Sequence, residues 1–263
     1  MTPRRPDWFH LSAALLASCV LLFVLAPLLG LVLSSSTGEL LGALADREVT
    51  GSIRLTLTAA LAAALVSALG GIPLAWLLAR KRFPGRALLL AIIDLPVIIP
   101  HSAAGLALLS VIGRDSLLGR LTGGSWVGTT AGIAAAMAFV SMPLLVDTAR
   151  EAFSLVPERL ERVARTLGAS PWRVFLTISL PMAWRGILSG LVLMWARGIS
   201  EFGAVVMIAY HPMTTPVLVF QRFNDFGLAA ARAAAVLLIL VCVALFLILR
   251  LLAGPPREEG RNA

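Results

Sequence analysis

The chain has 263 residues, of which 59% are hydrophobic and 14% are charged. A soluble domain carries about 25% charged residues, so this composition excludes an ordinary soluble fold and predicts a chain built into a membrane. The formal net charge of +8 does not indicate nucleic-acid binding, because no basic segment is interleaved with aromatic residues and basic residues in membrane proteins mainly set the topology.

Six apolar runs follow one another along the chain, each long enough for a transmembrane helix, which needs about 20 apolar residues. The runs cover residues 11–33, 53–79, 87–112, 127–146, 182–209 and 229–252. Most of the 22 Lys and Arg residues fall in the two tails and in the second and fourth loops, on the side that the positive-inside rule assigns to the cytoplasm. The sequence therefore predicts an all-α integral membrane protein with six transmembrane helices and both termini in the cytoplasm.

Proline and glycine interrupt two of these runs. They are Gly70, Gly71 and Pro73 in the second run, and Pro96, Pro100 and Gly105 in the third. Such breaks are tolerated within a bilayer where neighbouring helices or a wet cavity satisfy the freed backbone groups. They are typical of a transporter whose broken helices line a pathway, and equally of an ordinary kinked helix bundle.

The longest segment between runs, residues 150–181, has a helical pattern of its own. Apolar residues recur along one helical face, at Val156, Leu160, Val163 and Leu167. The other face is charged, with Glu158, Arg159, Glu161, Arg162 and Arg165. Gly168 is a typical C-terminal stop, and Ser170 and Pro171 suit the start of a second helix that ends near Pro181. Such an element predicts either a helix lying on anionic lipid or a docking helix for a soluble partner.

Residues 162–181, RVARTLGASPWRVFLTISLP, resemble the conserved cytoplasmic loop of ABC importer permeases. The family pattern ends in Gly, nine residues, Ile, one residue and Leu-Pro, which matches Gly168, Ile178, Leu180 and Pro181. The sequence differs where the family has Glu-Ala-Ala, because it has Arg162-Val163-Ala164 with a glutamate one position earlier. The resemblance implies coupling to an ATPase through Glu161, Arg162, Val163, Ala164, Thr166, Leu167, Gly168 and Ala169.

Further segments resemble the molybdate/tungstate importer permeases of this family. They are DLPVIIPHSAAGLALL at residues 94–109, ISEFGAVVMIAYHPMTTP at 199–216 and FNDFGLAAA at 223–231. The resemblance implies the type I importer transmembrane fold over residues 51–252. An N-terminal tail, first transmembrane helix and outer loop would precede it over residues 1–50, and a cytoplasmic tail would follow over residues 253–263.

The same resemblance implies a set of partners. It implies a multi-pass protein of the cell membrane that works as a homodimer in the lipid bilayer. ATP-binding cassette ATPase subunits would bind on the inside, and an extracytoplasmic oxyanion-binding protein would bind on the outside.

The sequence lacks recognisable catalytic chemistry. The chain has a single lysine, Lys81, in the segment Ala-Arg-Lys-Arg-Phe, which excludes the phosphate-binding loop of an ATPase. Its three histidines, His10, His101 and His211, are too scattered for a metal cluster. We therefore expect no cofactor, no metal and no enzymatic site, and ATP would be hydrolysed by a partner subunit.

Three ionisable residues within the runs are candidates for the transport route. Arg197 and Glu201 are four residues apart, hence on one helix face, and His101 lies in the interrupted third run. A lone charge at the bilayer centre costs about 2.5 to 3.5 kcal/mol on insertion scales, so these side chains should face the bundle interior, another subunit or water. They predict either a salt bridge that joins helices or a charged lining that lowers the barrier for an oxyanion.

The leading hypothesis is a permease subunit that imports molybdate or tungstate, with sulfate or another oxyanion as the alternative cargo. An ion-coupled secondary transporter would need no ATPase and would make the pattern from Gly168 to Pro181 accidental. A membrane-embedded hydrolase has no paired nucleophile and base in this sequence.

Overall fold

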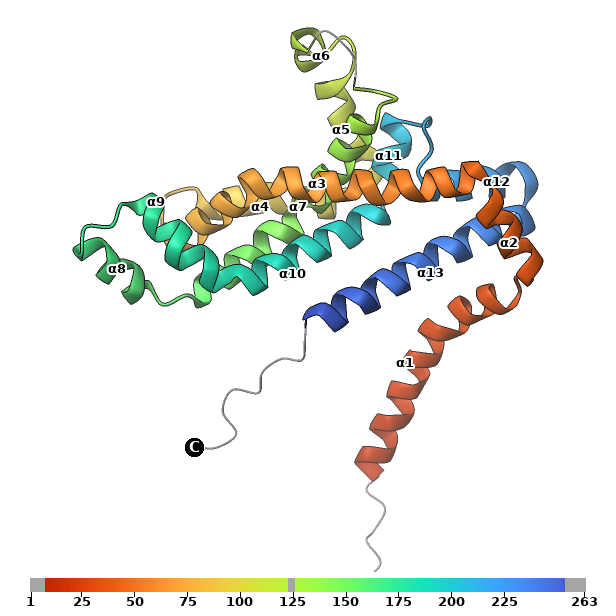
Figure 1. The fold of residues 1–263 in the computed structure, drawn as a ribbon, viewed down its shortest axis with the longest axis horizontal. Coiled ribbons are helices and arrows are strands. Elements are labelled where there is room, and N and C mark those ends of the chain that lie inside the picture. Colours follow the sequence, from red (N-terminus) through yellow and green to blue (C-terminus); the bar gives the residue numbers. More distant parts are fainter. Residues whose placement is uncertain (1–7, 123–125, 254–263) are drawn as a thin grey trace, which may run out of the picture. The chain divides into compact units, whose positions relative to one another are not determined.

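The computed structural model describes residues 8–122 and 126–253, and the regular elements in these ranges are all helical (Figure 1). In chain order they are α1 (Trp8–Leu33), α2 (Thr37–Ala45), α3 (Arg47–Arg80), α4 (Arg86–Ile98), α5 (His101–Ile112), α6 (Leu117–Leu121), α7 (Thr130–Leu155), α8 (Glu158–Thr166), α9 (Pro171–Val174), the π-helical turn η1 (Phe175–Ser179), α10 (Leu180–Ile199), α11 (Gly203–Ile208), α12 (Thr215–Phe226) and α13 (Leu228–Ala253). The predicted tail beyond residue 253 lies outside the described residues.

Five helical segments in the described ranges are long and apolar enough to cross a membrane, and the pair α4 and α5 makes a sixth if it is one broken span. The pair is bent by 114° at Ile99 and Pro100. Proline removes a backbone N–H and disfavours a helical conformation of the residue before it, and Ile99 is accordingly extended, with φ −72° and ψ 152°. The all-α fold is confirmed, and the candidate spans number the predicted six when α4 and α5 are counted as one broken span.

The second helix of the loop after α7 does not end near Pro181, so this predicted boundary is wrong. α9, η1 and α10 form one continuous helix, Pro171–Ile199. Directly before the proline, the N–H of Leu180 reaches back five residues to the carbonyl of Phe175. Such a π-turn changes the hydrogen-bond register of a helix, so the helix passes through a residue that has no N–H to donate.

The fifth apolar run is also shorter as a helix than the sequence predicts. It was expected to continue to residue 209, but α10 ends at Ile199 and α11 begins at Gly203. The polar residues Ser200 and Glu201 lie at this break, and the carboxylate of Glu201 accepts the N–H of Ala204 at 2.8 Å. A side chain that bonds a free N–H at the start of a helix favours a new helix over continuation of the old one.

The helices form two compact units, one of residues Met1–Thr50 with Val219–Ala263 and the other of Gly51–Leu218. In the first unit, none of the residues of α1 is buried. A helix that is apolar all round and unburied belongs in lipid or against another chain. α2 begins with a capping box between Ser36 and Glu39 and packs against α13.

Ion pairs connect the helices of the first unit. Arg232 of α13 bonds Glu39 at 3.0 Å, and Arg222 of α12 bonds both Asp46 and Glu48 at 2.7 Å. The hydrogen bond from the Arg222 guanidinium holds the pKa of the Asp46 carboxyl below its usual range. These pairs hold the segment around α2 against the ends of α12 and α13.

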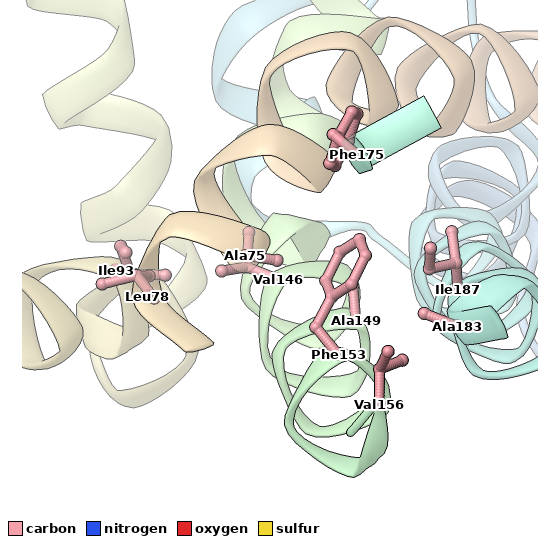
Figure 2. Close-up of a cluster of buried hydrophobic side chains, with 10 residues drawn as sticks. All are labelled: Ala75, Leu78, Ile93, Val146, Ala149, Phe153, Val156, Phe175, Ala183 and Ile187. Carbon is pink, nitrogen blue, oxygen red and sulfur yellow. The ribbon is translucent and has the colours of Figure 1, made fainter. Parts of the chain in front are cut away.

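A cluster of buried apolar side chains in the second unit lies between α3, α4, α7, η1 and α10 (Figure 2). Its buried side chains are Ala75, Leu78, Ile93, Val146, Ala149, Phe153, Val156, Phe175, Ala183 and Ile187. α7 supplies the central members, because half of its most apolar stretch is buried. Apolar residues around its whole circumference therefore find partners on several helices.

Glycines allow α10 to approach α7 closely. A Cβ on Gly186 would collide with the side chain of Ala152, and one on Gly190 would lie 3.1 Å from the Cβ of Thr148. These two glycines are four residues apart, so they lie on one face of α10. Small residues at this spacing are typical of packed helices in membranes, where van der Waals contact replaces the hydrophobic effect.

Candidate functional site

The short helix α8 is an amphipathic element beside α9 at one end of the second unit (Figure 1). It follows Pro157 and ends before Gly168, which has a left-handed φ of +87°. Ser170 then accepts the N–H of Arg173 and starts the next helix. The predicted helix, stop and cap are all present, because each depends only on neighbouring residues.

The apolar stripe of α8 is largely without a partner in this chain. Of its four members only Val156 is buried, at 4% exposure, whereas Leu160, Val163 and Leu167 are exposed by 42%, 49% and 82%. The element therefore presents apolar side chains outward next to exposed charges. Such a surface is suited to a protein partner or a lipid surface.

Glu161 does not belong to the exposed polar face, contrary to the helical pattern. It is buried, at 8% exposure, and its Oε1 accepts hydrogen bonds from Nε and Nη2 of Arg80 at 2.9 and 2.8 Å. The hydroxyl of Ser179 donates to the same oxygen at 2.8 Å. Two segments distant in the sequence thus turn this carboxylate inward.

The other residues predicted to couple the chain to an ATPase differ in exposure. Arg162, Val163, Thr166, Leu167 and Gly168 are exposed, and Ala164 and Ala169 are half-buried. Arg162 bonds Glu158 at 3.2 Å on the surface. An exposed pair of this kind contributes little stability, so both side chains remain available to a partner.

Aromatic rings join the base of this element to the second unit. Phe175 contacts Trp76 edge-on, with ring centroids 5.6 Å apart, and stacks on Trp172 at 5.7 Å. It also lies 6.1 Å from the ring of Phe153. Aromatic contacts of these geometries stabilise packing beyond the buried area alone.

Arg197, Glu201 and His101 meet at the other end of α10. Nη2 of Arg197 lies 3.0 Å from Oε2 of Glu201, and Nδ1 of His101 lies 2.8 Å from the same oxygen. The guanidinium also lies 2.9 and 3.0 Å from Nδ1 and Nε2 of His101. The structure therefore brings together the three residues that the sequence named as route candidates.

This charged cluster lies where two broken helices meet. His101 begins α5 after the bend from α4, and Glu201 lies in the break between α10 and α11. The backbones approach closely there, because a Cβ on Gly203 would lie 2.7 Å from the Cβ of His101. Glu201 is buried with a side chain 2% exposed, whereas those of His101 and Arg197 are 35% and 29% exposed. The buried carboxylate thus contacts two basic side chains that are themselves partly exposed on the surface of the chain.

Sequence reasoning missed Arg80 and Ser179. Arg80 belongs to a basic stretch whose pattern indicates only membrane orientation, and Ser179 lies in an apolar segment. No local sequence pattern at either position predicts its contact with Glu161. No group of acidic, histidine or cysteine side chains suited to a metal ion occurs among the described residues.

Comparison with known proteins adds to this geometry. Residues 71–254 match the family described as binding-protein-dependent transport system inner membrane component. The chain belongs to this family. A member from Thermococcus kodakarensis, the molybdate/tungstate transport system permease protein WtpB, is 42% identical over 95% of this chain and 98% of its own length. The sulfate transport system permease protein CysT of Escherichia coli is 33% identical over 86% of this chain and 84% of its own.

A solved structure shares the fold of this inner membrane component. It is a bacterial ABC transporter for the import of alginate, with a TM-score of 0.71 and 16% identity over 94% of this chain and 95% of the other. The type I importer permease fold is thereby confirmed for this chain, and the family match and the 42% identical relative place it among the membrane permeases of ABC importers. The chain is a permease subunit of the membrane.

Proposed function

We propose that this chain is the permease subunit of an ATP-driven importer of molybdate or tungstate. The observation that carries the proposal is the similarity, over nearly the whole of both chains, to a permease named for molybdate/tungstate transport. In this proposal ATP is hydrolysed by partner ATPase subunits, an extracytoplasmic protein delivers the oxyanion, and a second copy of the chain completes the route.

We propose α8 as the docking helix for the ATPase. The exposed side chains of Leu160, Val163 and Leu167 suit the helix-in-groove mode, in which an apolar face enters a groove of the partner. When the ATPase subunits close on ATP, the docking helices would move with them. Packed helices shift as rigid bodies, so this motion would open the route to the outside.

We propose the cluster of Arg197, His101 and Glu201 as part of the oxyanion route. A doubly negative ion pays a large desolvation cost within a bilayer, which a nearby guanidinium offsets. In the absence of the oxyanion, the carboxylate of Glu201 balances Arg197, with which it pairs at 3.0 Å. An arriving oxyanion would compete with Glu201 for the exposed side of the guanidinium.

The test is uptake in proteoliposomes that hold the chain together with an ATP-binding cassette ATPase and an oxyanion-binding protein from the same source. We expect accumulation of molybdate that requires ATP and is competed by tungstate. An ATPase without its phosphate-binding lysine is the control and should abolish uptake. Uptake that persists with this inactive ATPase would contradict the proposal and indicate an ion-coupled secondary transporter.

Sulfate is a second candidate cargo, favoured by the 33% identity to a sulfate permease. The discriminating measurement uses the same proteoliposomes with a large excess of unlabelled sulfate. Undiminished molybdate uptake supports the first proposal, whereas sulfate uptake that molybdate does not compete supports the second.

A further inference from the structure

A buried polar contact joins three segments of the second unit that are far apart in the sequence. It consists of Arg80 at the end of α3, Glu161 on α8 and Ser179 at the end of η1, all bonded through one carboxylate oxygen at 2.8 to 2.9 Å. Nη2 of Arg80 also donates to the carbonyl of Val156, just before α8, at 2.8 Å. The side chains of Arg80 and Glu161 are 7% and 11% exposed.

This contact is not required for α8 to form. The helix has local signals at both ends, Pro157 before it and the left-handed Gly168 after it. Burying an ion pair costs desolvation energy that apolar side chains of similar volume would avoid. The pair therefore serves attachment of the helix in one defined position more than its folding.

The rest of α8 offers few alternatives for attachment. Its apolar residues Leu160, Val163 and Leu167 are exposed. Its exposed ion pair joins Arg162 to Glu158 of the same helix and so does not attach α8 to another element. Within this chain it packs against α9 and η1. A displacement of α8 reaches α3 chiefly through the bonds from Arg80.

α3 in turn contacts the far end of α10. The indole N–H of Trp195 donates to the carbonyl of Leu57 on α3 at 3.2 Å. A Cβ on Gly198 would lie 3.2 Å from the Cβ of Ala60, so the backbones of the two helices approach closely there. This contact is one turn or less from Arg197, so α3 connects the base of α8 to the charged cluster across about 30 Å of helix.

We propose that Arg80, Glu161 and Ser179 form a lock that transmits the motion of α8 to α3 and from there to the cluster around Arg197. They are positioning residues for the coupling of ATP hydrolysis to transport. The inference rests on the proposed function, because it presumes an ATPase that moves α8. It assigns Glu161 an internal role instead of direct contact with that ATPase.

The experiment measures molybdate ions taken up per ATP hydrolysed by the complete importer in proteoliposomes. Glu161→Gln keeps the shape of the side chain and removes its charge. We expect an assembled importer that hydrolyses ATP but whose uptake per ATP falls by at least about fivefold, the lower end of typical couplings between sites. Arg80→Lys, which cannot reproduce the forked contact, should lower the ratio in the same direction.

A double-variant cycle tests whether the pair acts as a unit. Arg80→Ala together with Glu161→Ala should lower uptake per ATP no more than Glu161→Ala alone, because both changes break one interaction. Glu39→Gln is the matched control, since it breaks an Arg–Glu pair of 3.0 Å in the first unit and should leave the ratio unchanged.

Three results would overturn the lock. They are an unchanged ratio in assembled Glu161→Gln, additive losses in the cycle, and a ratio that falls equally in Glu39→Gln. If Glu161→Gln does not assemble, Ser179→Ala replaces it, because the ion pair remains and one hydrogen bond is lost. An unchanged ratio in this variant also overturns the lock. Failure of the unaltered chain to transport molybdate contradicts the proposed function instead.

Discussion

At the scale of single residues, burial distinguishes the carboxylates of Glu201 and Glu161 from the exposed pair of Arg162 and Glu158. Glu201 is nearly inaccessible, forms an ion pair with Arg197, contacts His101 and accepts the N–H of Ala204. Glu161 is similarly enclosed by Arg80 and Ser179. Removing one partner of such a pair leaves an uncompensated charge, which costs far more than loss of an exposed pair.

Arg197→Ala should abolish molybdate uptake while the importer still assembles. The guanidinium offsets the desolvation cost of a doubly negative ion. If this offset equals the cost of a charged group at the bilayer centre, its loss raises the transport barrier by about 2 to 3 kcal/mol and lowers the rate roughly a hundredfold. Uptake and the yield of assembled complex should be measured together. Arg197→Lys keeps the charge and should retain part of the activity.

A different outcome would indicate that the cluster of Arg197, His101 and Glu201 has only a structural role. If Arg197→Ala transports at the unaltered rate, the guanidinium only joins α10 to α5. If Arg197→Ala instead fails to assemble, the double variant with Glu201→Gln is informative, because it removes both charges of the pair. Recovery of assembly without recovery of uptake would separate the structural part of the effect from the transport part.

At the scale of elements, the decisive feature is a helix whose apolar face finds no partner in its own chain. α8 has local start and stop signals, yet three members of its stripe remain exposed. The continuous helix Pro171–Ile199 starts directly behind it. A displacement of α8 is therefore transmitted to this long helix as well as to α3.

Leu167→Cys should form a cross-link to the ATPase in the assembled importer. The side chain is 82% exposed on α8 and would enter the partner's groove. The measurement is a shift in electrophoretic mobility after treatment with a short bifunctional thiol reagent, with an ATPase that carries a single cysteine near the groove.

Phe23→Cys is the control for this cross-link. It is equally exposed, at 82%, but lies on α1, which is expected in lipid. Absence of a cross-link at Leu167 in every nucleotide state would contradict the docking role of α8. A cross-link at both positions would show that the reagent does not discriminate.

At the scale of the whole molecule, six spans and the distribution of basic residues determine which loops face the cytoplasm. With five spans and one bent pair, the positive-inside rule predicts that the segment between α1 and α2 lies outside and α8 inside. The proposed importer requires this arrangement, because its ATPase would act in the cytoplasm and its binding protein would act outside.

Cysteine labelling in intact cells tests this topology. The chain has two cysteines, Cys19 and Cys242, which are first replaced by alanine. Ser34→Cys, between α1 and α2, should react with a membrane-impermeant thiol reagent, and Arg162→Cys should react only after the cells are permeabilised. Both positions are exposed in this chain, so a difference reports the side of the membrane. Labelling of Arg162→Cys in intact cells would contradict the orientation.

The sequence by itself determined the features that depend on composition or on neighbours in the chain. The apolar runs predicted six spans, because a bilayer demands about 20 apolar residues for each. Gly168 predicted where α8 ends and Ser170 predicted where α9 begins, because capping involves residues within a few positions of one another. The spacing from Gly168 to Pro181 indicated the family.

Only the tertiary structure decided which charges are buried and what they touch. Helical periodicity assigned Glu161 to the exposed face, but Arg80 lies 81 residues before it in the chain, and no local pattern shows that approach. The π-turn at Phe175 likewise carries the helix through Pro181, where a local rule predicts an end. Long-range packing made Glu161 an internal contact, left Leu167 exposed for a partner, and brought His101 to Glu201 across 100 residues.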